Sequence, residues 1–261
     1  MIKQHKQSHF FHAFGYGFGA HIRKPFCETL HSQAATCVGA HGGHAFATAS
    51  NINLREVIRI GEARTQIAAI EEHDSYDTVV TASVENINIL NHVTADRIVA
   101  HLAVKDDKDL RKRADGTLEP STMWFQTIGT SFENLRIGGV SVEVEIEDEA
   151  GRNYHGPTPS SHNPVYDPFD PGKGPVNKEI NPKAHRTTLV KNVSSTSRNA
   201  GRIKPLGNMI IIPDFGVIHL AEYLVTPNAR HLNMLRIEFG CGVDGWSTGP
   251  GSSSNGETIK P

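Results

Sequence analysis

The segment FATASNINLREVIRIGEARTQIAAI (Phe46–Ile70) has a counterpart later in the chain, VVTASVENINILNHVTADRIVAHLAV (Val79–Val104). A shift of 33 residues superimposes their Thr-Ala-Ser triplets and places Asn53 on Asn86. A weaker third copy, TSFENLRIGGVSVEVEIE, puts Asn134 at the same point. Repetition at a fixed spacing indicates a fold built from similar supersecondary units.

The repeated segments have the composition of strands. Val, Ile, Thr and Ala dominate them, apolar residues alternate with polar ones, and the alternation changes phase near the repeated asparagine, as at a bend or bulge. We therefore expect an all-β fold, a short repeat-built β-solenoid with hairpins that protrude. A β-sandwich is the alternative, because spacings of 33 and 48 residues between these asparagines exceed most solenoid repeats.

Composition divides the chain into a single all-β domain (1–239) and a Gly/Ser-rich tail (240–261) that we expect to be mobile or to hold onto a neighbour. Within the domain, residues 151–208 hold eight of the 14 prolines. Proline removes a backbone donor and restricts the residue before it, so a long irregular insertion is expected there.

The N-terminal segment alternates aromatic residues with glycine. Phe14, Tyr16 and Phe18 should lie on one side of a strand whose glycine side packs closely against other backbone. Such a strand could extend the sheet of a neighbouring subunit, which makes these aromatic residues candidates for an assembly site. Alternatively, the strand pairs within its own sheet.

Several motifs in this order resemble a known family. They are HAFGYGFGA, the TAS-x-x-N-[LI] repeats with a V-T-A-D-R-I continuation, TSFENLRIGG, IIIPDFGVIHLAEY and a final N-x-L strand. Over most of Phe11–Phe239 the chain resembles the choice-of-anchor P domain of bacterial, largely actinobacterial, surface proteins. The resemblance implies an extracellular or cell-surface location and no established activity. Since no signal peptide is evident, a cytoplasmic location or another export route stays open.

Cys27, His31, Cys37 and His41 form a C-x3-H…C-x3-H array. Two thiolates and two imidazoles can close a tetrahedral zinc site. A Cys27–Cys37 disulfide is the rival interpretation and suits an exported protein. The third possibility is that the cysteines are unpaired and the histidines are solvated.

The repeated asparagines Asn53, Asn86 and Asn134 allow two interpretations. Their side-chain amides could stack at equivalent corners and hydrogen-bond along a structural ladder. Alternatively, each asparagine marks a turn or a bulge.

Charge, hydropathy and the catalytic motifs restrict the possible classes of function. A net charge of −2 argues against a nucleic-acid partner, and no apolar stretch is long enough for a transmembrane helix. No catalytic motif occurs in a supporting context, so we expect a non-enzymatic structural or surface-assembly subunit that self-associates or forms filaments. The alternatives are a ligand- or carbohydrate-binding module, with Trp124, Tyr166 and Trp246 lining a pocket, and a zinc-dependent enzyme that uses the Cys/His array.

Overall fold

The computed structural model describes residues 8–108, 123–147, 150–152, 185–195, 204–225, 229–240 and 244–259. Within these ranges every regular element is a β-strand, and the strands pair antiparallel in two sheets. The all-β prediction is therefore confirmed. Residues 109–122 and most of the proline-rich segment lie outside the described residues.

The first sheet contains 11 strands and the second contains ten. The first comprises β1 (Ser8–Tyr16), β2 (Phe18–Lys24), β3 (Glu28–Gln33), β4 (Thr36–Val38), β14 (His185–Thr188), β16 (Lys204–Leu206), β17 (Met209–Ile212), β18 (Gly216–Val225), β19 (Ala229–Phe239), β20 (Asp244–Thr248) and β21 (Gly251–Ile259). The second comprises β5 (Gly43–Leu54), β6 (Ile58–Glu71), β7 (Ser75–Ile89), β8 (Val93–Asp107), β9 (Met123–Gln126), β10 (Ser131–Glu133), β11 (Arg136–Ile137), β12 (Val140–Ile146), β13 (Ala150–Arg152) and β15 (Val190–Ser195).

The repeated segments are hairpins of the second sheet, in the order β5–β6, β7–β8 and β11–β12. Each closes on a short turn that contains two successive residues with positive φ, the geometry that matches the twist of paired strands. These residues and their φ values are Arg55-Glu56 (45°, 62°), Leu90-Asn91 (52°, 54°) and Gly138-Gly139 (59°, 78°).

An asparagine with positive φ lies four positions before each loop: Asn51 (55°), Asn86 (53°) and Asn134 (50°). These residues mark a kink across the second sheet at which the buried face changes phase. On β7, for example, Val80 and Val84 are buried before the kink, and Ile87 and Ile89 after it. The predicted bend is confirmed, and Asn51 rather than Asn53 marks it in the first copy.

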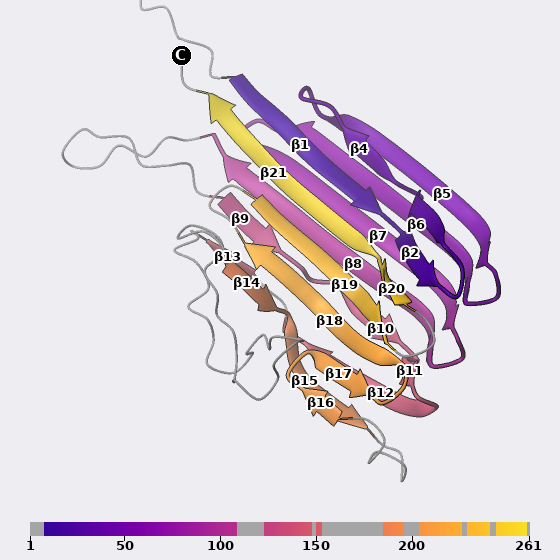
Figure 1. The fold of residues 1–261 in the computed structure, drawn as a ribbon. Helices are drawn as coiled ribbons and strands as arrows, with labels where there is room; N and C mark the ends of the chain where they lie inside the picture. Colours follow the sequence, from indigo (N-terminus) through magenta and orange to yellow (C-terminus); the bar gives the residue numbers. More distant parts are fainter. Residues whose placement is uncertain are drawn as a thin grey trace, which may run out of the picture.

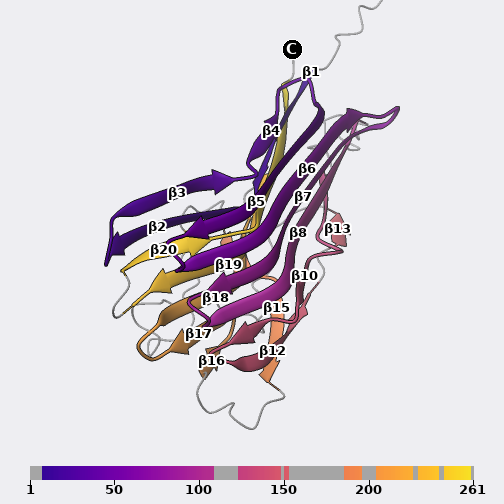
Figure 2. The same ribbon diagram turned by 90° about the vertical axis from the view of Figure 1, so that its right-hand side faces the viewer.

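The two sheets face one another, as the view along their edges shows (Figure 2). One large cluster of buried apolar side chains draws on both, with Ile58, Ile89 and Ile98 from the second sheet and Ile218 and Ile237 from the first. Figure 1 shows β1, β21, β19 and β18 of the first sheet in front of the long strands β6–β8. Burial of these faces is the main stabilising contribution.

The sheets approach most closely at β1. A Cβ added to Gly15 would lie 2.7 Å from Thr65 Cγ2, and one added to Gly17 would lie 2.6 Å from Ala63 Cβ. The glycine side is tightly packed, as predicted, but its nearest contacts are side-chain methyls of the opposite sheet and not the backbone that the prediction named. Only glycine leaves room for that approach.

Two segments differ from the sequence-based expectation. Residues 240–261, expected to be a tail, contribute β20 and β21, and β21 pairs with both β1 and β19. Small residues suit this interior position, because Ser252 and Ser253 are buried and a Cβ at Gly251 would lie 2.5 Å from the Tyr16 ring. The predicted irregular insertion (151–208) also contributes the short strands β14, β15 and β16.

Candidate functional site

The predicted metal ligands are spread along one side of the first sheet. Cys37 is opposite Phe14 in the β1–β4 pair, whereas Cys27 immediately precedes β3. Both cysteines are exposed and free, so no disulfide joins them in this structure. No group of three or more potential metal ligands was found among the described residues. The third cysteine, Cys241, lies outside them.

The three aromatic residues of the predicted assembly site have different environments. Phe14 is 37% exposed and contacts the His231 ring at 6.2 Å between centroids, whereas Phe18 is 1% exposed and belongs to the core. Tyr16 lies over Gly251, and its hydroxyl is 3.2 Å from Thr248 Oγ1. Burial raises the pKa of Tyr16.

Strand β1 pairs within its own sheet, with β21 on one side and β4 on the other. Both edges of Ala13–Gly15 are therefore occupied by this chain. Of the two alternatives for the N-terminal strand, the structure shows pairing inside the molecule. The assembly role predicted for Phe14, Tyr16 and Phe18 stays a prediction.

The three predicted ladder asparagines hydrogen-bond to different partners. Asn53 accepts a hydrogen bond from the Glu56 backbone N–H at 3.0 Å and donates to Glu56 Oε1 at 2.8 Å, which supports the first hairpin loop. Asn134 Nδ2 donates to Asp96 Oδ2 at 2.6 Å. Asn86 lies at the kink. These positions match the second interpretation, in which each asparagine marks a turn or a bulge.

A shallow polar groove of about 490 Å³ lies along the kink of the second sheet. Its lining includes Asn86, Asn88, Asp96, Asn134 and Arg136. Carboxylate, amide and guanidinium groups can together donate and accept several hydrogen bonds. Of the predicted pocket aromatics, Trp124 lies on β9 and Trp246, 44% exposed, on β20, while Tyr166 lies outside the described residues.

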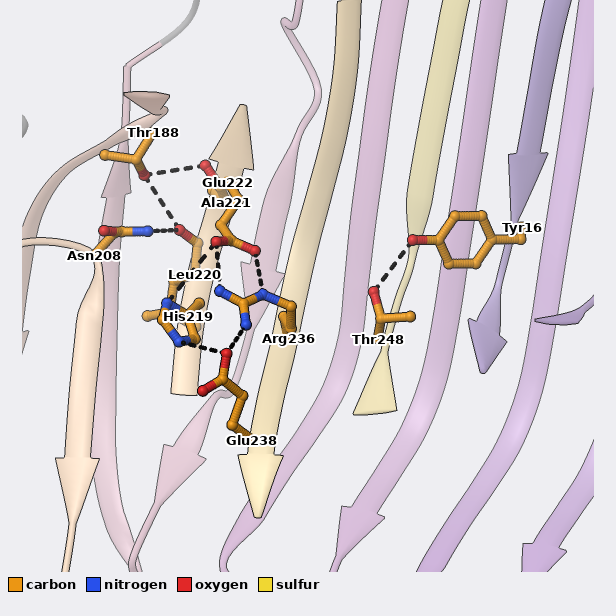
Figure 3. Close-up of polar contacts among 10 residues, drawn as sticks. All are labelled: Tyr16, Thr188, Asn208, His219, Leu220, Ala221, Glu222, Arg236, Glu238 and Thr248. Atoms are coloured by element: carbon orange, nitrogen blue, oxygen red, sulfur yellow. Dashed lines mark hydrogen bonds and ion pairs between the residues drawn. The ribbon is translucent and has the colours of Figure 1, made fainter. Parts of the chain in front are cut away.

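A charged cluster that the sequence analysis did not identify lies on β18 and β19 (Figure 3). Arg236 donates two hydrogen bonds to Glu222, from Nε at 2.7 Å and from Nη2 at 2.8 Å, and a third from Nη1 to Glu238 Oε1. His219, 2% exposed, lies between the carboxylates, 3.9 Å from Glu222 Oε1 and 3.7 Å from Glu238 Oε1. Two carboxylates thus share one guanidinium in a half-buried site, and hydrogen bonds between charged groups of this type are stronger than neutral ones.

Burial lowers the pKa of Arg236, but its hydrogen bonds to Glu222 and the charges of Glu222 and Glu238 outweigh that effect and raise it. The guanidinium therefore stays charged, as guanidinium groups do in proteins. Arg236 contacts both carboxylate oxygens of Glu222 and one of Glu238, an arrangement that also occurs in structural ion-pair networks.

The backbone of β18 is irregular at Ala221, the residue before Glu222. Ala221 has φ 44° and does not pair with β19, although the register of the β18–β19 pair is the same on both sides of it. Thr188 Oγ1 donates to Ala221 O at 3.0 Å, and Asn208 Nδ2 donates to Leu220 O at 3.1 Å (Figure 3). These two side chains therefore bind the backbone carbonyl groups at the irregular position.

The outer face of the second sheet carries an apolar hollow of about 440 Å³ beside strand β5. Its lining includes Phe46, Ala68, Val79 and Thr81. Phe46 is 59% exposed and Val79 37% exposed, so these apolar side chains face solvent. Exposed apolar surface next to a sheet edge is typical of a protein–protein contact.

The fold and these surfaces define an all-β protein of two facing antiparallel sheets with an ion-pair cluster on one sheet and an exposed apolar edge on the other. A family model described as "Domain of unknown function (DUF8256)" matches residues 9–173. The match covers more than half of the chain, which therefore belongs to this family. No match was found among curated proteins or among solved structures. No helix able to span a membrane occurs in the part of the chain that the structure describes.

Proposed function

We propose that this protein is a non-enzymatic structural subunit of a cell-surface assembly. The observation that carries the proposal is the exposed apolar surface that runs from β5 to β7, where Phe46 on β5 and Val79 on β7 face solvent; β5 is an outer strand of the ten-stranded sheet among the described residues. The resemblance to choice-of-anchor P domains supports a surface location. Together these features favour a protein that acts through contacts with other proteins.

We further propose that the two sheets act as a β-sandwich rather than as a solenoid. A solenoid stacks its repeats along one axis so that each contacts only its neighbours. Here β21, near the C-terminus, lies between β1 and β19, and the core joins residues from Phe18 to Phe239. Such long-range pairing favours a closed structural unit with surfaces available for assembly.

The solution mass of the purified full-length chain tests the proposal, together with negative-stain electron microscopy. We expect dimers, higher oligomers or filaments at tens of micromolar. A protein that stays monomeric over this range and does not associate with cell-surface preparations would contradict an assembly role. Metal analysis is the companion measurement: stoichiometric zinc that Cys27→Ser abolishes would favour a metal-dependent enzyme instead.

A second candidate function is that of a ligand-binding module, and the polar groove at the kink favours it. Asp96, Asn134 and Arg136 offer hydrogen-bonding groups suited to a polyhydroxylated ligand such as a carbohydrate. Isothermal titration of mono- and oligosaccharides into wild type and Asp96→Ala tests this function. Binding that the variant loses would support it, and absence of heat with all of them would reject carbohydrate as the ligand class.

A further inference from the structure

Strand β5 differs from the other outer strands that the structure describes. It has 12 residues, and its sequence GHAFATASNINL contains no proline and no residue with a permanent charge. Among the described residues it pairs only with β6. Natural edge strands are normally protected from pairing by charge, proline, bulges or short length.

The other outer strands carry such protection. They are β3 with Glu28, the three-residue strands β4, β10 and β13, the four-residue strand β14, β15 with Lys191, and the three-residue strand β16 with Pro205. Lys191 also forms an ion pair with Glu145 at 2.6 Å. The contrast singles out β5 as the edge that is open to pairing with another strand.

The alternation of β5 limits how a second strand can pair with it. Ala45, Ala47 and Ala49 are half-buried on the core side, whereas His44, Phe46, Thr48 and Ser50 are exposed on the outer side. The regular part ends at Asn51, where φ is 55°. A partner strand has to keep its own apolar side toward the core, because a one-residue slip exchanges the two faces.

A second copy of β5, antiparallel and centred on Ala47, satisfies this condition over the regular segment. Ala47 then faces Ala47 of the second copy, and Ala45 faces Ala49. On the outer side Phe46 faces Thr48, an aromatic against a β-branched residue, which is a favourable cross-strand pair. His44 faces Ser50, so no like charges meet.

We propose that two copies of this chain pair through β5 about a two-fold axis at Ala47, which joins their second sheets into one continuous sheet. The proposal rests on the assembly function above and specifies its contact. The apolar hollow supports it, because Phe46 and Val79 line a surface beside the new pair. An isologous contact of this type is the commonest form of soluble dimer.

Charges introduced at Phe46 and Thr48, which face each other across the proposed strand pair, test its register. In Phe46→Lys/Thr48→Lys, each lysine directly opposes a lysine of the second copy, and like charges opposite one another are destabilising. We expect the solution mass to fall from dimer to monomer. Phe46→Glu/Thr48→Glu should behave in the same way, and an equimolar mixture of the two variants should restore the dimer through two Lys–Glu pairs. Both substituted residues are exposed, so the fold should persist, which circular dichroism checks.

The matched control is Asn192→Lys/Ser194→Lys on β15, the opposite edge of the same sheet, where both residues are also exposed. It should leave the dimer intact. A cross-link gives an independent readout: with Cys27, Cys37 and Cys241 replaced by serine, Ala47→Cys should form a covalent dimer on mild oxidation, and Ser194→Cys should not.

The outcomes separate this inference from the function on which it rests. If wild type associates but the β5 lysine variant is equally associated, or if the Lys and Glu variants do not recombine, pairing through β5 is overturned and the assembly function stands. If wild type and all variants are monomers, the assembly function itself fails. Cross-linking of Ser194→Cys but not of Ala47→Cys would place the contact between the two copies at β15 and would overturn pairing through β5.

Discussion

The side chain of Asn86 lies directly over Gly61 on the neighbouring strand β6. A Cβ at Gly61 would be 2.9 Å from both the Cβ and the Nδ2 of Asn86. Asn86 has φ 53°, a conformation that asparagine tolerates better than most residues. The kink of the second sheet thus depends on Gly61, which has no side chain, and on Asn86, which can adopt the left-handed conformation.

Gly61→Ala should therefore destabilise the fold, by about 1–3 kcal/mol, the usual range for overpacking. The measurement is the free energy of unfolding in urea. Asn86→Gly keeps the left-handed conformation and removes the obstructing side chain. The double variant Gly61→Ala/Asn86→Gly should consequently lose less stability than the sum of the two single variants. Additive losses would show that the two residues do not contact one another in solution.

The close approach of the sheets gives a second prediction. Gly17→Ala should cost about 1–3 kcal/mol, because the added methyl would lie 2.6 Å from Ala63 Cβ on the opposite sheet. Ala63→Gly in the same chain should recover part of that loss by making room. Gly19→Ala is the control, because its nearest neighbouring atom would be 3.6 Å away, an ordinary contact. Equal losses at Gly17 and Gly19 would argue against tight packing at Gly17.

The repeats predicted the hairpins correctly but not their register. Matching Thr-Ala-Ser gives a shift of 33 and equates Asn53 with Asn86. In the structure Asn51 corresponds to Asn86, because both lie at the kink. Asn53 corresponds to Asn88, because each accepts a hydrogen bond from the backbone N–H of the following turn. The similar sequences NINL at 51–54 and NINI at 86–89 could have indicated this alignment. Loop geometry rather than strand composition fixes the correspondence.

Other features could not be predicted from the sequence, because they depend on contacts between residues that are distant along the chain. The many glycine and serine residues among the last 20 give this segment the composition of a linker, but the same small residues are needed where β21 runs beside β1 under the Tyr16 ring. The cluster around Arg236 depends on the β18–β19 pairing and lies beside the positive φ of Ala221. Neither the register of the pair nor this backbone conformation is visible in local sequence.

The Arg236–Glu222 pair gives a third prediction. Glu222→Gln removes the charge that accepts two hydrogen bonds from a half-buried guanidinium, and should cost about 1–3 kcal/mol of unfolding free energy. Glu145→Gln is the matched control, since its ion pair with Lys191 is exposed and should contribute little. Similar small changes in both variants would show that the cluster on β18 and β19 contributes no more than a surface ion pair.

The final prediction concerns pH. Burial lowers the pKa of His101 and of His231 below the ordinary value of 6.5, and it also lowers that of His9 despite the nearby Asp106 carboxylate. The unfolded chain therefore takes up protons at these histidines at a higher pH than the folded chain does. Stability is full above pH 6.5 and falls as the pH drops through that value toward the lower folded-state pKa values.

His101 is the residue on which to test this dependence, because only burial shifts its pKa and its Nδ1 lies 2.9 Å from Thr81 Oγ1. Urea unfolding of wild type and His101→Gln from about pH 8 to about pH 5 spans the titration of histidine. The wild-type free energy of unfolding should decrease over this range, and the variant should show a shallower decrease. Titration of the His101 ring followed by NMR should give a midpoint below 6.5 in the folded protein. A midpoint above that value, or an unchanged slope in the variant, would contradict the proposed effect of burial.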